Sequence, residues 1–177
     1  SDVYKRQSPT VIVPCIDTAT ADGAGYEGVA RTIAVKGACF ENYDAASWAA
    51  AIDAAAPSGI IVVAATPQSK DIAARIAARR NLAIVQDVVA IDGKNLTSPI
   101  YSGKAMQTVA ISGDAAVSIR ANVFSAAASS AANVSVVDQT GDVATAVQEI
   151  IARASTRLDV AEANIIISGG RGMGDPS

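Results

Sequence analysis

Three apolar runs in the first part of the chain predict short strands. Residues 10–16 (TVIVPCI) predict a short buried strand, and residues 60–65 (IIVVAA) predict a strand that is buried throughout. Between them lies ARTIAVK (residues 30–36), in which Ile33 and Val35 alternate with threonine and alanine. That alternation predicts a second strand. The segment between the first two runs is rich in Gly, Asp and Thr and predicts a loop.

A helix is expected between the second and third runs. Asn42 or Asp44 can cap its N-terminus, because both side chains accept hydrogen bonds from the free N–H groups of a first turn. Trp48 and Ile52 are four residues apart and therefore share one face. Pro57, followed by serine and glycine, ends the helix.

A second helix is expected after the third run, in the segment SKDIAARIAARRN. Ser69 can cap it, and Ile72 and Ile76 face the sheet. Arg79 and Arg80 stand near its C-terminus, where positive charge is favoured by the helix dipole. Strands and helices therefore alternate as β-α-β-α, which is typical of a layered α/β domain with parallel strands.

The apolar runs become shorter and closer together after the second helix. Residues 82–91 and 95–103 are separated by turn residues, and residues 105–111 and 115–121 flank a Ser-Gly-Asp turn. Short strands at this spacing predict an antiparallel extension. Residues 125–135 (SAAASSAANVS) have small side chains and low complexity, and they predict a mobile surface loop.

The C-terminal part of the chain predicts a change of domain. Residues 142–155 carry apolar side chains at helical spacing, and a short strand is expected at Ile165–Ile167 after a linker. We therefore expect one α/β domain over residues 8–160 and the start of a second over residues 161–177.

Composition and charge argue against several classes of function. Half of the residues are hydrophobic and only 4% are aromatic, which suits helices packed closely on a parallel sheet. A net charge of −3, from 14 basic and 17 acidic residues, gives no electrostatic signal for nucleic acid. No stretch reaches the roughly 18 apolar residues that a membrane span requires. We therefore expect a soluble protein without a nucleic-acid partner.

The chain has no histidine and two cysteines. The absence of histidine argues against a Ser-His-Asp triad, most catalytic zinc sites and His-based proton transfer. Cys15 and Cys39 form no Cys-x-x-Cys motif, and two buried thiols are the favoured interpretation. The alternative is an enzyme with a cysteine nucleophile activated by a helix N-terminus or a nearby cation. We predict no catalytic residue and no metal site.

Four glycines crowd six positions near the end of the chain, in SGGRGMG. A dinucleotide-binding GxGxxG read from Gly170 requires a glycine where Asp175 stands, and a P-loop read from Gly169 requires a lysine there. Both motifs therefore fail. Arg171 remains among backbone amides that glycines leave accessible, an arrangement that suits a phosphate or an electron-rich ring. The alternative is a glycine-rich turn with a solvated arginine.

Three stretches together carry a resemblance to a known family. SGGRGMGDPS after an apolar strand resembles the opening of the FAD-binding domain of the electron transfer flavoprotein α-subunit. QDVVAIDGKNLTSPIYSGKAMQTVAI resembles that family's strand pair around a Pro-Ile-Tyr-x-Gly-x-Ala segment. ATPQSKDIAARIAARRNL is similar to its Thr-x-x-x-Lys-Asp helix. The three stretches occur in the family's order and cover most of the chain from about Val29 onward.

The resemblance implies a fold and a cofactor. It implies a three-layer α/β domain, similar to the adenine-nucleotide α-hydrolases, and then the first strand and glycine-rich turn of an FAD-binding α/β domain. Arg171, Gly170 and Gly172 then contact FAD, and residues 147–153 become extended rather than helical. The N-terminal SDVYKRQ looks like a translated adaptor, so a fragment cut at both ends is expected, one that does not retain FAD alone.

The resemblance also implies a role. Such α-subunits are electron carriers rather than enzymes, and they pair with a β-subunit. They pass electrons from flavin dehydrogenases, such as the acyl-CoA dehydrogenases of fatty acid β-oxidation, to a membrane quinone oxidoreductase. The implied compartment is the bacterial cytoplasm, or the mitochondrial matrix in a eukaryote. A flavin carrier needs binding and orientation from its protein rather than an acid, base or nucleophile.

One further alternative remains open, a stand-alone nucleotide-binding α/β module of the stress-protein type. It requires the N-terminal part alone to bind ATP or AMP.

Other conspicuous residues are interpreted as structural: Trp48 as a core anchor, Tyr101 as packing across strands, Arg75, Arg79 and Arg80 as a solvated helix face, and Asp87 and Asp92 as turn formers rather than metal ligands.

Overall fold

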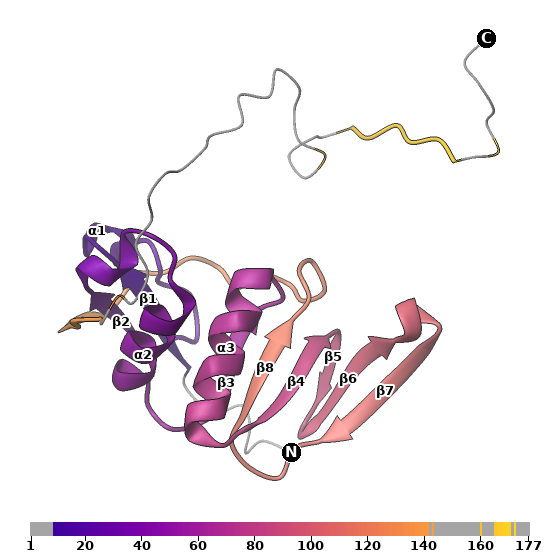
Figure 1. The fold of residues 1–177 in the computed structure, drawn as a ribbon, viewed down its shortest axis with the longest axis horizontal. Coiled ribbons are helices and arrows are strands. Elements are labelled where there is room, and N and C mark those ends of the chain that lie inside the picture. Colours follow the sequence, from indigo (N-terminus) through magenta and orange to yellow (C-terminus); the bar gives the residue numbers. More distant parts are fainter. Residues whose placement is uncertain (1–8, 142, 144–159, 161–164, 171, 173–177) are drawn as a thin grey trace. The chain divides into compact units, whose positions relative to one another are not determined.

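The computed structural model describes residues 9–141, 143, 160, 165–170 and 172. The chain divides into two compact units, Ser1–Ala146 and Val147–Ser177. Figure 1 shows the ribbon, and the helices and strands of the described residues lie in the first unit. The expected boundary between residues 160 and 161 stays a prediction.

The first of three sheets is parallel. It contains β1 (Thr10–Cys15), β2 (Arg31–Lys36) and β9 (Val134–Asp138) in the order β1-β2-β9. Residues 32–35 at the centre of β2 are all buried, so the strand is covered on both faces. The predicted second strand is confirmed. A central parallel strand is buried on both faces.

The second sheet is also parallel. It contains β3 (Ile61–Ala64), β8 (Ala115–Ile119) and β4 (Ala83–Val88) in the order β3-β8-β4. Helix α3 (Pro67–Arg80) covers one face of it, where Ala73 and Ala77 pack against Ala116 of β8. Alanines on both sides allow this close approach of helix and sheet.

The third sheet is antiparallel and contains β5 (Ala90–Asp92), β6 (Asn95–Ile100) and β7 (Ala105–Ala110). Leu96 of β6 packs with Val88, Ala115 and Val117 of the second sheet. The short 3₁₀ segment η3 (Tyr101–Gly103) joins β6 to β7. The predicted antiparallel extension is confirmed for these strands. It is wrong for residues 115–119, which form β8 at the centre of the parallel sheet.

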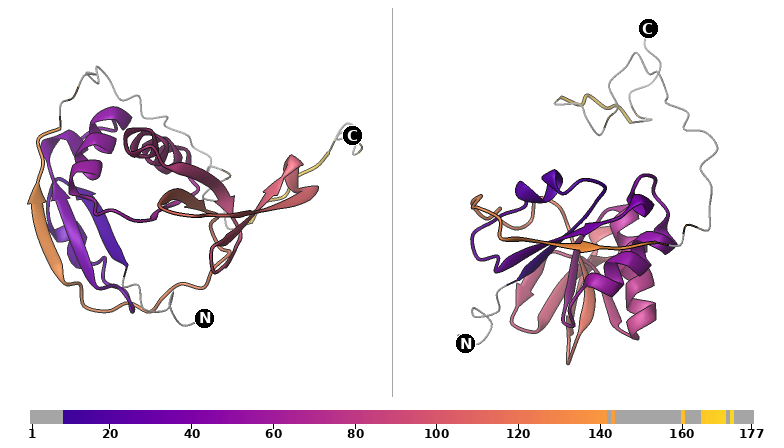
Figure 2. Two further views of the ribbon diagram at one scale, coloured as in Figure 1. Left: turned by 90° about the horizontal axis from the view of Figure 1, so that it is seen from below. Right: turned by 90° about the vertical axis from the view of Figure 1, so that its left-hand side faces the viewer.

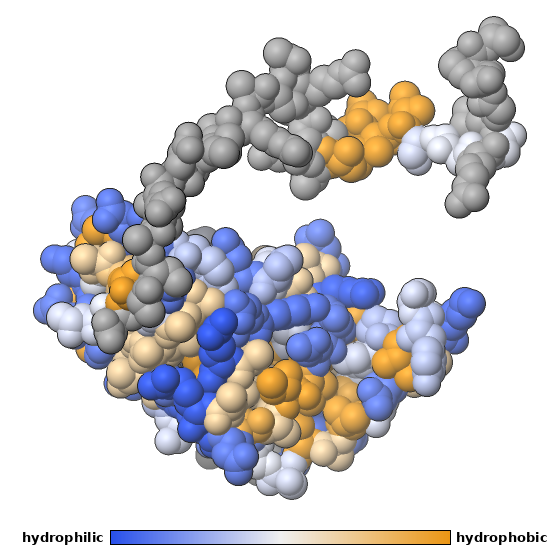
Figure 3. Space-filling view, viewed as in Figure 1, coloured by the Kyte–Doolittle hydropathy of each residue, from blue (hydrophilic) through white to orange (hydrophobic). Residues whose placement is uncertain are grey.

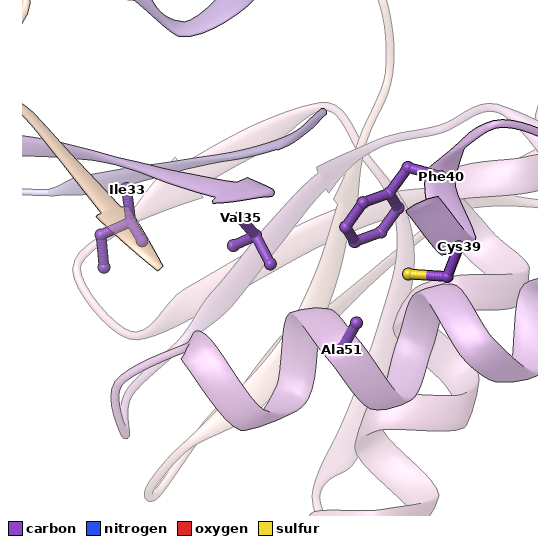
Figure 4. Close-up of a cluster of buried hydrophobic side chains, with 5 residues drawn as sticks. All are labelled: Ile33, Val35, Cys39, Phe40 and Ala51. Carbon is purple, nitrogen blue, oxygen red and sulfur yellow. The ribbon is translucent and has the colours of Figure 1, made fainter. Parts of the chain in front are cut away.

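Helix α2 (Ala45–Ala55) begins at Asp44, whose carboxylate accepts a hydrogen bond of 2.8 Å from the N–H of Ser47. Its core face contributes Ala51 to a cluster with two β2 side chains and two residues of η2 (Ala38–Phe40). Figure 4 shows these five side chains, and α2 and α3 lie side by side in Figures 1 and 2. The cluster consists of Ile33, Val35, Cys39, Phe40 and Ala51.

Several expected boundaries were wrong. The segment after β1 contains a short helix, α1 (Ala19–Asp22), and α3 is capped by Thr66 rather than Ser69. The helix begins earlier than expected because Pro67 fits the first helical position, where no backbone N–H is needed, and Thr66 is therefore the capping residue. Strand β3 is not buried throughout: it is an outer strand of its sheet, and Val62 is 56% exposed.

The segment at residues 125–135 lies at the surface, as expected, but it is tied down by backbone contacts. The N–H of Ser130 donates to the carbonyl of Gly25, and the N–H of Glu27 donates to the carbonyl of Ala128. The last two residues of the segment already belong to β9. Its last two residues therefore belong to a sheet, and the rest forms a surface loop.

The second unit is described only in part. Ile165, Ile166 and Ile167 are 83%, 58% and 95% exposed and form no strand, contrary to expectation. The space-filling view of Figure 3 colours hydrophobic residues orange, and the described part of this unit includes such a group. The helix or extended segment expected within residues 142–155 lies almost wholly outside the described residues. The α/β fold class is confirmed for the first unit.

Candidate functional site

The carboxyl ends of the β3-β8-β4 strands form the first candidate site. In open α/β sheets, ligands bind at this edge, often at the N-terminus of the following helix. Here β3 ends at Ala64 and α3 begins after Thr66. The Thr66 hydroxyl accepts a hydrogen bond from the N–H of Ser69 at 3.2 Å. One of the free N–H groups of the first turn is therefore already satisfied by the protein.

An ion pair occupies the same edge. The Lys70 ammonium lies 2.7 and 2.8 Å from the two carboxylate oxygens of Asp87, and both side chains are partly buried. Asp87 has a positive φ of 55°, and its N–H donates to the Ser118 hydroxyl of β8 at 3.0 Å. A register shift in β4 between Val85 and Val88 places Asp87 in this conformation.

The Lys70–Asp87 ion pair determines which ligands this edge of the sheet can bind. A lysine in the first turn of a helix is a suitable phosphate ligand when its charge is unopposed. Here both oxygens of Asp87 contact the ammonium of Lys70, so that charge is balanced within the protein. The arrangement does not favour the stand-alone nucleotide-binding alternative.

The glycine-rich turn is the second candidate site. Gly170 and Gly172 are exposed, and a Cβ added at either would meet no atom of the described residues within 4 Å. Their backbone is therefore accessible to a ligand. Arg171 lies outside the described residues. The three predicted FAD contacts remain predictions.

Comparison with known proteins identifies the family. The family model "Electron transfer flavoprotein domain" matches residues 5–160. The chain belongs to the electron transfer flavoprotein family. The resemblance stated from the sequence motifs is thereby confirmed at the level of the family.

Three curated relatives agree with this assignment. The electron transfer flavoprotein subunit alpha of Bacillus subtilis is 33% identical over 123 residues, which are 64% of this chain and 38% of that protein. Protein FixB of Clostridium saccharobutylicum is 35% identical over 129 residues, 66% of this chain and 39% of that protein. The subunit alpha of Syntrophomonas wolfei is 28% identical over 176 residues, 87% of this chain and 55% of that protein. The chain therefore spans roughly two fifths to just over half of these relatives.

The cysteines of this electron transfer flavoprotein domain do not resemble nucleophiles. Both are buried, and the Cys15 thiol contacts the carbonyl of Val35 at 3.7 Å. Burial raises the pKa of Cys15, and the nearby charge of Asp17 adds to the rise, which Lys36 only partly opposes. A nucleophilic cysteine requires the opposite shift, toward the thiolate. The interpretation as buried thiols is supported.

Two other interpretations can be compared with the structure. The Trp48 ring packs against the cluster of Figure 4, and its indole N–H donates to the carbonyls of Cys39 and Asn42 at 2.9 and 3.0 Å, so the core-anchor interpretation is confirmed. Tyr101 is 77% exposed at the tip of the β6–β7 hairpin. The interpretation of Tyr101 as packing across strands is therefore wrong, because its positive φ of 50° turns the chain there.

The charged residues of α3 are more ordered than expected. Arg79 and Arg80 both contact the carboxylate of Asp53 in α2, so they connect two helices instead of forming only a solvated face. Arg75 pairs with Asp71 one turn earlier, as a surface residue does. Among the residues that the structure describes, no group of three metal-capable side chains occurs, and no helix is long and apolar enough to cross a membrane.

The Lys70–Asp87 pair was missed from the sequence. The sequence predicts Asp87 as a turn former that, together with Asp92, brackets the apolar stretch VVAI. The only available signal was a carboxylate inside an apolar run that otherwise predicts a buried strand, since a buried charge requires a partner. The partner lies 17 positions earlier in a different element, so sequence spacing alone does not identify it.

Proposed function

We propose that this chain supplies the N-terminal α/β domain of an electron transfer flavoprotein α-subunit and leads into the FAD-binding domain. With a β-subunit and FAD, the whole protein passes electrons from flavin dehydrogenases, such as those of fatty acid β-oxidation, to a membrane quinone oxidoreductase. The family match over residues 5–160 carries the proposal. The proposed compartment is the bacterial cytoplasm, or the mitochondrial matrix in a eukaryote.

The described residues are compatible with a structural role for the α/β unit and a flavin-binding role for the glycine-rich turn. At the carboxyl edge of the β3-β8-β4 sheet, Lys70 is balanced by Asp87, which leaves the α/β unit a structural role. The open space around Gly170 and Gly172 permits a flavin nucleotide to approach the backbone closely. Arg171 would hold the cofactor between them through its guanidinium. FAD, when bound, supplies the redox centre, and the protein binds and orients it.

Flavin retention tests the proposal. The C-terminal domain of a relative is grafted after Gly172, the graft is co-expressed with a β-subunit, and the visible flavin absorbance of the purified complex is measured. We expect a yellow complex, and we expect Arg171→Ala to lower its flavin content. Arg75→Ala, on the exposed face of α3, is the matched control and is expected to leave the flavin content unchanged.

Two results would contradict the proposal at different levels. A graft that pairs with the β-subunit but stays colourless would refute the flavin site and leave the subunit assignment standing. A graft that neither pairs nor binds flavin would refute the proposed role. In that case, calorimetry of the chain with ATP would test the nucleotide-binding alternative directly.

A further inference from the structure

A row of three aromatic side chains lies at the N-terminal end of helix α2. Between ring centroids, Trp48 lies 5.2 Å from Phe40 and 5.4 Å from Tyr43, with interplanar angles of 80° and 69°. Both contacts have the edge-to-face geometry that aromatic pairs prefer. Of the two rings that contact Trp48 among the described residues, only Tyr43 carries a phenol, which loses an electron far more readily than a benzene ring. The row therefore places two oxidisable rings in direct contact.

The row leads from the core toward the surface. Phe40 is 6% exposed and belongs to the buried cluster of Figure 4. Trp48 is half-buried against the same cluster, whereas Tyr43 is 36% exposed. An electron that moves from Tyr43 to an oxidised Trp48 therefore transfers the oxidised state from the core side of α2 to a side chain that solvent can reach.

The indole N–H of Trp48 is held by two backbone carbonyls. It donates to those of Cys39 and Asn42, at 2.9 and 3.0 Å. A carbonyl oxygen accepts a hydrogen bond, but it does not take up a proton at neutral pH. Loss of one electron from Trp48 therefore yields an indole radical cation that keeps its N–H. This cation is a stronger oxidant than the deprotonated indole radical, so it draws an electron from a neighbouring phenol.

The hydroxyl of Tyr43 lies beside a base. It is 3.3 Å from the Asp71 carboxylate of α3 and equally far from the backbone carbonyl of Gln68, and the carboxylate is the stronger base of the two. The guanidinium of Arg75 donates to the other oxygen of Asp71 at 3.0 Å. That contact orients the carboxylate, so its second oxygen is directed toward Tyr43.

Tyr43 holds its proton at neutral pH. Burial raises the pKa of Tyr43, and the charge of Asp71 and the hydrogen bond to it add to the rise, which Arg75 only partly opposes. The phenolic proton must therefore leave when the ring loses an electron. An oxidised phenol is a strong acid, and a carboxylate at hydrogen-bond distance is a suitable acceptor for its proton.

We propose that Trp48, Tyr43 and Asp71 form an exit path for oxidising equivalents, which moves a one-electron oxidation of the half-buried indole to the surface phenol. An oxygen-centred or inorganic radical takes one electron from Trp48. Tyr43 then gives one electron to the indole radical cation and its phenolic proton to Asp71. Trp48 is restored, and the products are a neutral Tyr43 phenoxyl radical and a protonated Asp71 carboxyl group.

The path returns to its starting state through a soluble reductant. An enediol such as ascorbate gives a hydrogen atom to the exposed phenoxyl oxygen of Tyr43, and Asp71 releases its proton to water. The oxidation then leaves no lasting change in the core around Trp48. This activity requires neither FAD nor a β-subunit, so it stands or falls independently of the proposed function.

Pulse radiolysis of the chain in azide solution tests the path. The azide radical is a one-electron oxidant that attacks indoles preferentially, and Trp48 is the only tryptophan of the chain. We expect the absorption of the indole radical to decay while that of a phenoxyl radical grows, at a rate independent of protein concentration. In Tyr43→Phe, which keeps the ring and loses the phenol, the indole radical should persist. Tyr101→Phe, at the exposed hairpin tip, is the matched control and should behave like the unsubstituted chain.

Two further substitutions test the proton acceptor. Asp71→Asn keeps an oxygen acceptor but removes the base, and we expect it to slow the growth of the phenoxyl signal about tenfold. This is less than a fully buried base contributes, because water also reaches the exposed phenol. Arg75→Gln removes the same ion pair but keeps the base, so it should not slow the transfer.

Several results would overturn the proposal. One is an indole radical that decays as fast in Tyr43→Phe as in the unsubstituted chain. Another is a rate proportional to protein concentration, since that indicates transfer between molecules. An unchanged rate in Asp71→Asn would refute the role of Asp71 as proton acceptor. The unsubstituted chain provides a readout without any variant: transfer should be slower in D₂O than in H₂O, and equal rates would contradict a coupled proton transfer.

Discussion

Arg80 shows how one side chain can join two helices. Its guanidinium donates to the carboxylate of Asp53 and to the backbone carbonyls of Asp53, Ala56 and Pro57, all at the C-terminal end of α2. The last carbonyls of a helix have no partner within the helix. A planar group with several N–H donors satisfies a number of them at once. The arginine of α3 therefore acts as the cap of α2.

Removal of Arg80 should be costly. We expect Arg80→Ala to lower the free energy of unfolding by about 2 kcal/mol, because several partly buried acceptors lose a charged donor. Arg75→Ala removes only an exposed ion pair within one helix and should cost less than about 0.5 kcal/mol. Urea unfolding followed by circular dichroism measures both values. Equal effects of the two substitutions would show that Arg80 does not cap α2.

Cys15 should make the fold sensitive to alkaline pH. Burial and Asp17 raise the pKa of this thiol in the folded chain. The unfolded chain loses the proton at the ordinary thiol pKa of about 8.5, so the contribution to stability is complete below that pH and is lost as pH rises through the folded pKa. We expect the urea midpoint to fall between about pH 8 and pH 10. The fall should be smaller in Cys15→Ala, and an equal fall in both proteins would contradict the assignment.

At the scale of elements, the sequence predicted what is local. The second strand, helix α2 with Asp44 as one of two candidate caps, and the β6–β7 hairpin were all expected, because periodicity and capping chemistry depend on neighbouring residues. The sheet partners of β3 and β8 were not predicted correctly. An apolar run has the same sequence pattern in an outer strand as in a central one. The run IIVVAA therefore did not show that β3 is an outer strand.

The candidate sites also differ in whether they depend on local sequence or on long-range contacts. The glycine-rich turn was visible because its chemistry lies within a few consecutive residues. The Lys70–Asp87 pair joins α3 to β4, so it could be recognised only from the fold. Such a pair depends on long-range pairing, which a single sequence does not specify through periodicity.

Gly25 illustrates a packing constraint between elements. A Cβ on Gly25 would overlap backbone atoms of Ser130, Ala131 and Ala132, which belong to the segment leading into β9. Backbone cannot move aside as a flexible side chain can, so we expect Gly25→Ala to lower the free energy of unfolding by about 2 kcal/mol. Gly23→Ala is the matched control, since a Cβ there meets nothing within 4 Å. It should be neutral or stabilising by up to about 1 kcal/mol.

Thermal unfolding of the two alanine variants distinguishes the explanations. A lower midpoint for Gly25→Ala alone indicates that close approach of two segments requires glycine. An equal loss in both variants would instead point to a general helix or turn effect around α1. The comparison also tests whether the segment at residues 128–132 is held against residues 25–27, as the backbone hydrogen bonds indicate.

At the scale of the whole molecule, the described residues of the two units differ in how far their side chains are buried. The first unit contains all three sheets and four hydrophobic clusters of buried residues. The described residues of the second unit include three exposed isoleucines without a strand and two glycines in open space. Apolar β-branched residues at such exposure gain stability when another layer covers them.

This difference predicts the behaviour of the chain toward flavin. A bound cofactor normally has some 70–90% of its surface buried by its site. The open surroundings of Gly170 and Gly172 provide no such enclosure, so we expect the chain, alone or with a β-subunit, to be purified colourless. After incubation with FAD, ultrafiltration should leave the flavin in the filtrate, while the circular dichroism spectrum shows a folded α/β unit. Stoichiometric retention of FAD by the chain alone would show that its own residues form a complete site, and the second unit would then need no further domain for binding.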